Sequence, residues 1–135
     1  MGKKKIIIDT NIIVSAYGWE GKEKEILRHI LDEKYLLITC KEQIEELRRV
    51  LDYPKLYFTS EEKLKLLGII YSMAEVIEIP GNLKVVKEDP DDNIILESAL
   101  IGKANYIVTG DHHLLNLREY SGIMIVNSSD FLQLI

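Results

Sequence analysis

Short runs of consecutive apolar residues alternate along the chain with longer segments in which apolar positions recur at helical spacing. Such runs are typical of strands buried on both faces of a parallel sheet, and the spaced segments are typical of helices with one buried face. Strands are predicted over residues 5–9, 35–39, 75–79, 105–109 and 123–126. Helices are predicted over about 21–34, 40–51, 60–74, 91–102 and 111–117, and a last helix follows residue 127.

Strands that alternate with helices favour right-handed crossover connections, so the expected fold is α/β, with a mainly parallel sheet and helices on both faces. No element is predicted between Asp9 and Gly21. The helix over 40–51 has the spacing of a capping box, because Glu42 and Gln43 each follow Thr39 and Cys40 by three residues. The other predicted helix caps are Ser60, Asp91 or Asp92, and Asn127 or Ser128.

Composition limits the class of protein. The chain has 135 residues, of which 47% are apolar and 29% charged, so a single globular domain over residues 1–135 is expected. Its one cysteine, Cys40, excludes an internal disulfide and any multi-cysteine zinc site. The apolar runs are too short to span a membrane or to form a signal-peptide core, and a cytoplasmic protein is therefore expected. A net charge of −5 argues at first against nucleic acid as a partner.

Two acids follow predicted strands directly. Asp9 follows the first strand and Asp111 the fourth. In open α/β sheets, ligand sites lie at the carboxyl ends of the strands. Either acid alone could be a helix cap, but two acids in the same context weaken that interpretation.

Two further acids are candidates for the same site. The cluster Asp89-Pro90-Asp91-Asp92 begins a predicted helix, and Asp92 is the acid placed most firmly within it. One acid would suffice as a cap, and the repulsion among three would be eased by a cation. On the helix over 40–51, Glu46 falls at the edge of the apolar face, whereas Glu45 points nearly opposite it.

Three or four carboxylates converging in one cleft would bind a hard divalent cation, Mg²⁺ or Mn²⁺, through oxygen atoms. Such an ion lowers the pKa of a bound water and stabilises the charge of a phosphodiester transition state. The sequence alone does not show that the acids converge.

In order along the chain, these segments resemble the PIN-domain family of metal-dependent ribonucleases. The similar segments are IIIDTNIIVSA, EELRRVL, DPDDNIILESAL and IVTGDHHLL, and they span residues 6–117. The resemblance implies a three-layer fold with a parallel sheet of four or five strands. It implies Asp9, Glu46, Asp92 and Asp111 as the catalytic, metal-binding acids, with Asn11 and Thr109 supporting them through hydrogen bonds.

The resemblance also implies an activity and partners. A metal-activated water would attack the RNA phosphodiester and leave a 5′-phosphate and a 3′-hydroxyl. Many members of this size are the toxin of a toxin–antitoxin pair and commonly form homodimers, and the DPDDN and TGDxxLL segments look most like that branch. An antitoxin protein is therefore an expected partner beside the RNA substrate. Other members process ribosomal RNA or act in RNA decay.

Several residues allow two interpretations. Of the adjacent His112 and His113, one is expected to pack and one to be solvated, although either could reach a metal in the cleft. Cys40 is interpreted as structural. Tyr17 and Trp19 are placed in a loop, where they either pack or stack on an RNA base. Exposed basic residues are either phosphate contacts or solvated surface; they are Lys3–Lys5, Arg48, Arg49 and Lys55.

Other functions fit less well. A dehalogenase-like phosphatase needs a second Asp where this chain has Asn11, and a receiver domain needs a Lys after its last strand, where this chain has Asn127 and Ser128. A non-catalytic PIN-like scaffold for RNA or protein would be marked by the loss of a metal ligand, and all four acids are present. The acidic balance does not exclude RNA, because four of the acids are assigned to a metal site that accepts phosphate once loaded.

Overall fold

The computed structural model describes residues 2–135. Within these residues, six strands form one sheet in the order β3-β2-β1-β4-β6-β5, which is parallel except for the antiparallel β5–β6 pair. The predicted α/β class and mainly parallel sheet are confirmed, but the predicted number of four to five strands was wrong. The strand absent from the prediction is β5, which has only two residues and so leaves no pattern in the sequence. The strands are β1 (Lys4–Ile8), β2 (Tyr35–Cys40), β3 (Glu75–Ile77), β4 (Tyr106–Val108), β5 (Glu119–Tyr120) and β6 (Ile123–Val126).

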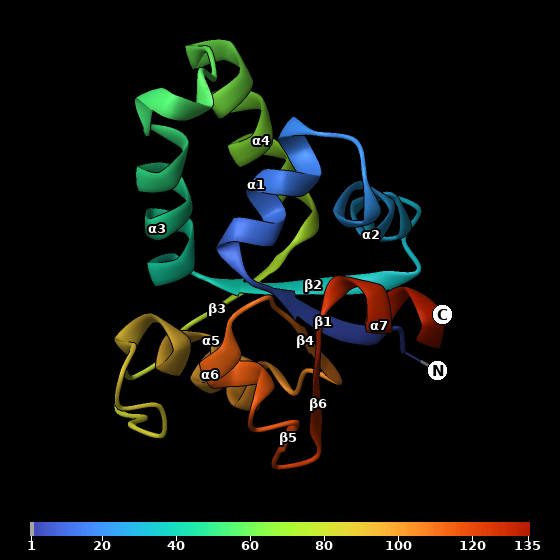
Figure 1. Ribbon diagram of the computed structural model, residues 1–135, viewed down its shortest axis with the longest axis vertical. Coiled ribbons are helices and arrows are strands. Elements are labelled where there is room, and N and C mark those ends of the chain that lie inside the picture. The colour runs from blue at the N-terminus through green and yellow to red at the C-terminus, as the bar shows by residue number, and fades with distance from the viewer. Residues whose placement is uncertain (1) are drawn as a thin grey trace.

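Helices cover both faces of the sheet, which makes three layers. Figure 1 shows α1 to α4 and α7 on one side of the sheet and α5 and α6 on the other. The helices are α1 (Thr10–Gly18), α2 (Lys22–Leu31), α3 (Lys41–Leu51), α4 (Ser60–Met73), α5 (Pro90–Gly102), α6 (His112–Leu115) and α7 (Ser128–Leu134), with a 3₁₀ turn at Pro54–Leu56. No helix in the described part of the chain has the length and apolarity to cross a membrane.

The central strand β1 is apolar without interruption because both of its faces are buried. Ile6 and Ile8 belong to the core cluster under α1 to α4, whereas Ile7 belongs to the cluster under α5 and α6. Successive strand residues face opposite sides of a sheet, so a strand covered on both faces must be apolar at every position.

The first helix, α1, was not predicted. Its sequence, TNIIVSAYG, is rich in β-branched residues that are weak helix formers. It forms because the Asp9 side chain accepts a hydrogen bond from the Asn11 amide at the helix start, and because Ile13 and Val14 are buried in the core. Tertiary packing therefore outweighs local propensity here. Trp19, expected in a loop, lies just after this helix and packs edge-on against Phe58 at 5.9 Å.

Three of the predicted helix caps are corrected. The cap of α4 is Thr59, not Ser60, and it forms the capping box with Glu62. The cap of α5 is Asp89, not Asp91 or Asp92, whose backbones are already helical. Cys40 precedes α3 but makes no side-chain cap. For α7 the predicted Asn127 is confirmed.

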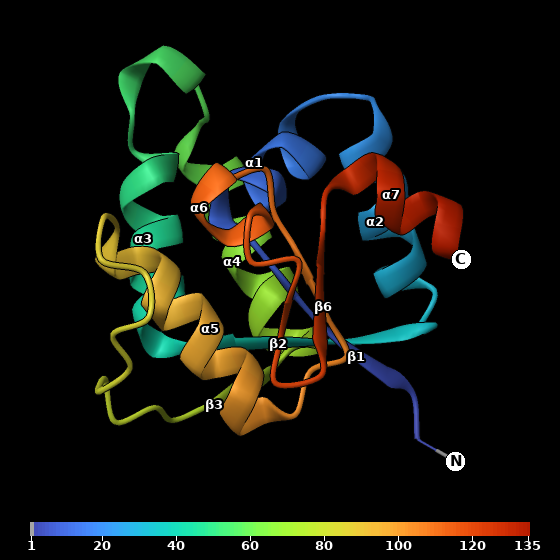
Figure 2. The same ribbon diagram turned by 60° about the horizontal axis from the view of Figure 1, so that its bottom comes forward.

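The segment 78–89 between β3 and α5 is held in place by two side chains of α5. The Asn93 side-chain oxygen accepts hydrogen bonds from the amides of residues 85 and 86, and the Glu97 carboxylate accepts those of residues 81 and 82. Figure 2 shows this segment outside α5, and the predicted strand over 75–79 ends early, at Ile77. A cavity of about 540 Å³ lies between the segment and α5, and none of the four predicted acids lines it.

Candidate acidic metal site

The acidic site begins where β1 and β4 end side by side. Ile8 pairs with Val108 in parallel register, which places Asp9 next to Thr109. The Asp9 amide donates to the Val108 carbonyl oxygen at 2.9 Å. The Thr109 hydroxyl donates to Asp9 Oδ2 at 2.7 Å and accepts the Asp111 amide at 3.0 Å. A single buried threonine thus fixes the relative positions of two predicted site acids.

Asp9 is a buried carboxyl, only 9% exposed. Burial raises its pKa, and the negative charges of Asp111 and Asp89 raise it further, whereas the hydrogen bonds from Thr109 and the Asn11 amide lower it. The Asn11 side chain itself is exposed, so its contribution to the site comes from its backbone. The two hydrogen bonds therefore do not offset the effect of burial and of the neighbouring charges, and the pKa of Asp9 stays above its ordinary value.

Asp89, Asp92 and Asp111 converge at the start of α5. One carboxylate oxygen of each lies within 4.8 Å of one oxygen of both others. Asp92 is only 3% exposed, and its Oδ2 is buried without a hydrogen-bond partner. Burial and the charges of Asp111 and Asp89 raise the pKa of Asp92 to about 8. A buried carboxylate oxygen with no donor needs either a proton or a cation.

Asp89 was not among the four predicted acids. As the cap of α5, it accepts the Asp91 amide with Oδ1 at 3.0 Å, which leaves its second oxygen available. A signal for it was present in the sequence, since Asp89 precedes Asp92 by three residues and side chains at that spacing lie near one another at a helix start. Exposed Asp91, between them, does not join the cluster.

Glu46 lies on α3, which contacts α5 across the site. It is half-buried, whereas the neighbouring Glu45 is exposed, as the helical pattern predicted. Burial raises the pKa of Glu46 and the charges of Asp91 and Asp9 add to this, whereas the Thr10 side chain and, more weakly, the positive charge of Arg49 lower it. The pKa values of Glu46 and Asp9 are therefore raised by neighbouring acids, although neither residue belongs to the three-carboxylate cluster.

Two polar residues hold α3 against the end of β1. The Gln43 side-chain amide donates to the Ile8 carbonyl oxygen at 2.6 Å, and the Thr39 hydroxyl donates to Gln43 Oε1 at 2.6 Å. Both side chains are buried. Each belongs to one of the two pairs whose spacing predicted a capping box, Thr39 with Glu42 and Gln43 with Cys40. Their hydrogen bonds instead join the helix that carries Glu46 to the strand that precedes Asp9.

The remaining candidates lie outside the cluster. His112 and His113 are both exposed, so the expectation that one of them packs was wrong; α6 has a single turn, and Leu114 fills its buried position. Cys40 is fully buried, and burial raises the pKa of its thiol, which agrees with a structural role.

The donor set fits a hard divalent cation. Every side chain that converges is a carboxylate, and the buried Asp92 oxygen has no other partner. Oxygen ligands of this kind suit Mg²⁺ or Mn²⁺, which keep several waters and need few protein ligands. A bound cation would also offset the repulsion that raises the pKa values of Asp9 and Asp92.

Comparisons with known proteins give a family match and two similar folds. A sequence model described as PIN domain matches residues 5–113. The structure is similar to VapBC2 from Rickettsia felis, solved bound to a DNA fragment from their promoter, with a TM-score of 0.63 and 18% identity over 91% of this chain and 98% of that chain. It is equally similar to PAE2754 from Pyrobaculum aerophilum, with a TM-score of 0.63 and 18% identity over 98% of this chain and 96% of that chain. Comparison with curated protein sequences gives no match.

Proposed function

Because the chain belongs to the PIN-domain family, a family of nucleases, we propose that it is a divalent-metal-dependent endoribonuclease. The observation that carries the proposal is the convergence of Asp89, Asp92 and Asp111 beside Asp9. The whole of residues 1–135 is proposed to act as one nuclease domain, in the cytoplasm.

In this proposal Asp9, Glu46, Asp92 and Asp111 hold Mg²⁺ or Mn²⁺, directly or through water, and Asp89 adds a fifth carboxylate. When bound, the ion supplies an activated water and stabilises the charge of the phosphodiester transition state. Thr109 and the Asn11 amide hold the Asp9 carboxylate in place and favour its ionised form. Glu46, facing the cluster from α3, is placed to orient a water or accept its proton.

The biological role proposed is that of a toxin restrained by an antitoxin protein. The fold shared with VapBC2 supports this, as does the similarity of the DPDDN and TGD segments to the toxin branch of the family. An RNA-processing or RNA-decay role uses the same chemistry, and a gene for a small DNA-binding antitoxin beside this one would favour the toxin.

Cleavage of a mixed RNA pool tests the proposed chemistry. We expect fragments with 5′-phosphates in Mg²⁺ or Mn²⁺, none in excess EDTA, and none with Asp9→Asn in either metal. Asp32→Asn is the matched control, because Asp32 is an exposed acid at the carboxyl end of α2. Circular dichroism checks that both variants fold.

Two outcomes contradict the proposal in different ways. Full activity in EDTA or with Asp9→Asn excludes the metal mechanism. Failure of the wild-type protein to cleave any RNA, together with RNA binding, indicates a non-catalytic scaffold instead.

A further inference from the structure

Cationic and aromatic side chains continue from the acidic site along the outer side of α3. We call Arg49, Tyr53 and Lys55 the α3 track. Glu46 and Arg49 are spaced by three residues, so they share one face of α3, and Tyr53 follows two residues after the helix ends at Leu51.

Arg49 is the end of the track nearest the acids. It follows Glu46 by three residues on α3, a spacing at which helix side chains are neighbours, and its positive charge lowers the pKa of Glu46. Within residues 2–135, neither Arg49 nor Lys55 forms an ion pair. Arg49 is therefore an available cation directly beside the site.

Two acids close to the track in sequence pair with lysines outside it. Glu45 pairs with Lys41 at 4.0 Å, and Asp52 pairs with Lys63 at 2.9 Å. The end of α3 consequently presents unpaired positive charge in a chain whose overall charge is negative. A local positive strip on an acidic protein attracts a polyanion to that place rather than to the whole surface.

Tyr53 is an exposed aromatic side chain held by a constrained backbone. Its side chain is 55% exposed, and its amide donates to the Val50 carbonyl oxygen at 3.0 Å. Pro54 follows it and restricts Tyr53 to extended conformations, in agreement with its φ of −64° and ψ of 122°. A rigid ring loses little entropy when it stacks on a planar ligand.

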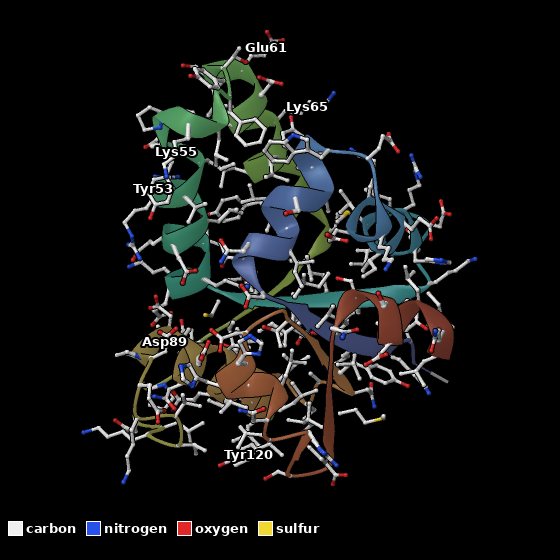
Figure 3. All side chains as sticks on the ribbon, in the orientation of Figure 1. Tyr53, Lys55, Glu61, Lys65, Asp89 and Tyr120 are labelled. Atoms are coloured by element: carbon white, nitrogen blue, oxygen red, sulfur yellow. The ribbon has the colours of Figure 1, made fainter. Side chains whose placement is uncertain are left out.

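Figure 3 shows Tyr53 and Lys55 on the outer side of α3, on the same side of the molecule as Asp89. We propose that the α3 track binds single-stranded RNA that leaves the acidic site. Arg49 contacts the phosphate next to the scissile one, Tyr53 stacks on an unpaired base, and Lys55 contacts a further phosphate. Aromatic rings interleaved with cations are the usual means of binding single strands, since bases paired in a helix are not free to stack on protein. The inference rests on the proposed ribonuclease function.

The test measures the anisotropy of a short fluorescein-labelled single-stranded RNA of mixed sequence. Ca²⁺, another hard cation with oxygen ligands, replaces Mg²⁺, and gels verify that the RNA stays intact. The variants are Arg49→Gln, Lys55→Gln, Tyr53→Ala and Tyr53→Phe. The matched controls on α4 are Tyr71→Ala, since Tyr71 is 56% exposed, and Lys65→Gln, since Lys65 is exposed and unpaired within residues 2–135.

We expect Tyr53→Ala to weaken binding about fivefold to 150-fold, because stacking on one base is lost. Tyr53→Phe keeps the ring and should bind like wild type. Arg49→Gln and Lys55→Gln should each reduce the slope of log affinity against log salt by about 0.7, because each removes one phosphate contact. The two α4 variants should match wild type in affinity and slope.

The outcomes separate this inference from the function on which it rests. If wild type cleaves RNA but the track variants bind RNA as it does, the assignment of RNA to the track is wrong and the ribonuclease proposal stands. If duplex RNA competes as well as single strands, the single-strand assignment is wrong. If wild type neither binds nor cleaves RNA, the proposed function itself is wrong.

Discussion

The Thr109 hydroxyl donates a hydrogen bond to Asp9 Oδ2 across 100 positions of sequence. The Thr109 hydroxyl oxygen in turn accepts a hydrogen bond from the Asp111 amide, so one side chain positions the acids at the ends of two neighbouring strands.

Replacing Thr109 by Val keeps the side-chain volume but removes the hydroxyl. We expect a loss of about 1–3 kcal/mol in the free energy of unfolding, because the Asp9 carboxylate and the Asp111 amide lose a buried partner. The pKa of Asp9 should rise further, since a bond that favours its ionised form is gone, and metal-dependent cleavage should then require a higher pH. Urea unfolding and a pH–rate profile measure both effects. Thr109→Ser retains the hydroxyl and serves as the control; an equal loss in both variants would argue against the hydrogen bond as the cause.

Asp92 makes the metal-free protein less stable as the pH rises. Its pKa in the folded state is about 8, against 3.8 as the ordinary value, so the unfolded chain releases this proton more easily. This contribution to stability is complete below about pH 4 and is lost as the pH rises through about 8. In EDTA at pH 8, Asp92→Asn should therefore be more stable than wild type by about 1–3 kcal/mol, with the unpaired amide offsetting part of the gain. The advantage should vanish near pH 4. Parallel stability curves for the two proteins would contradict the shifted pKa.

Magnesium should stabilise the protein more at high pH than at low pH. The cation and the proton compete for the same carboxylates, and a ligand that binds only the folded state raises its stability by mass action. We expect the increase in Tm on adding MgCl₂ to be larger at pH 8 than at pH 6, and to be nearly absent in Asp92→Asn. Thermal melts in MgCl₂ and in EDTA provide the comparison. An equal increase at both pH values would mean that Mg²⁺ binds elsewhere.

Glu46 and Glu45 form a matched pair for testing the site. They are neighbours on α3 and accept the same substitution, but only Glu46 is turned toward the acids. Glu46→Gln should lower RNA cleavage by about a hundredfold to ten-thousandfold, a range typical of losing a general base. Glu45→Gln breaks an exposed ion pair with Lys41 and should change little. Similar activities in the two variants would remove Glu46 from the proposed site.

Gln43 should matter for the site without touching it. Gln43→Leu leaves the Ile8 carbonyl oxygen and the Thr39 hydroxyl without their partner, and a cost of about 1–3 kcal/mol in the free energy of unfolding is expected. Because α3 would be less firmly held to β1, kcat should fall while binding of RNA by the α3 track is retained. Steady-state kinetics beside anisotropy distinguishes this from general unfolding, in which both quantities decline together.

The sequence predicted the buried strands well, because a strand covered on both faces must be apolar throughout, as Ile6, Ile7 and Ile8 are. It also separated Glu46 from Glu45, since helical spacing determines which of them turns inward. It did not reveal α1, whose β-branched residues are held helical by burial of Ile13 and Val14. Asp89 was overlooked for a related reason. Its place in the cluster depends on α5 beginning at residue 90, and helix starts are poorly determined by sequence patterns.

The pairing of β1 with β4 has a consequence for the order of events during synthesis. Asp9 and Glu46 are made before Asp89, Asp92 and Asp111, and β1 acquires its second neighbour only when β4 has emerged. A nascent chain that has been translated only as far as Glu46 therefore carries two of the five carboxylates of the proposed site. The proposed site cannot form until translation has passed Asp111, so the ribosome that makes the chain is not exposed to the completed site before then.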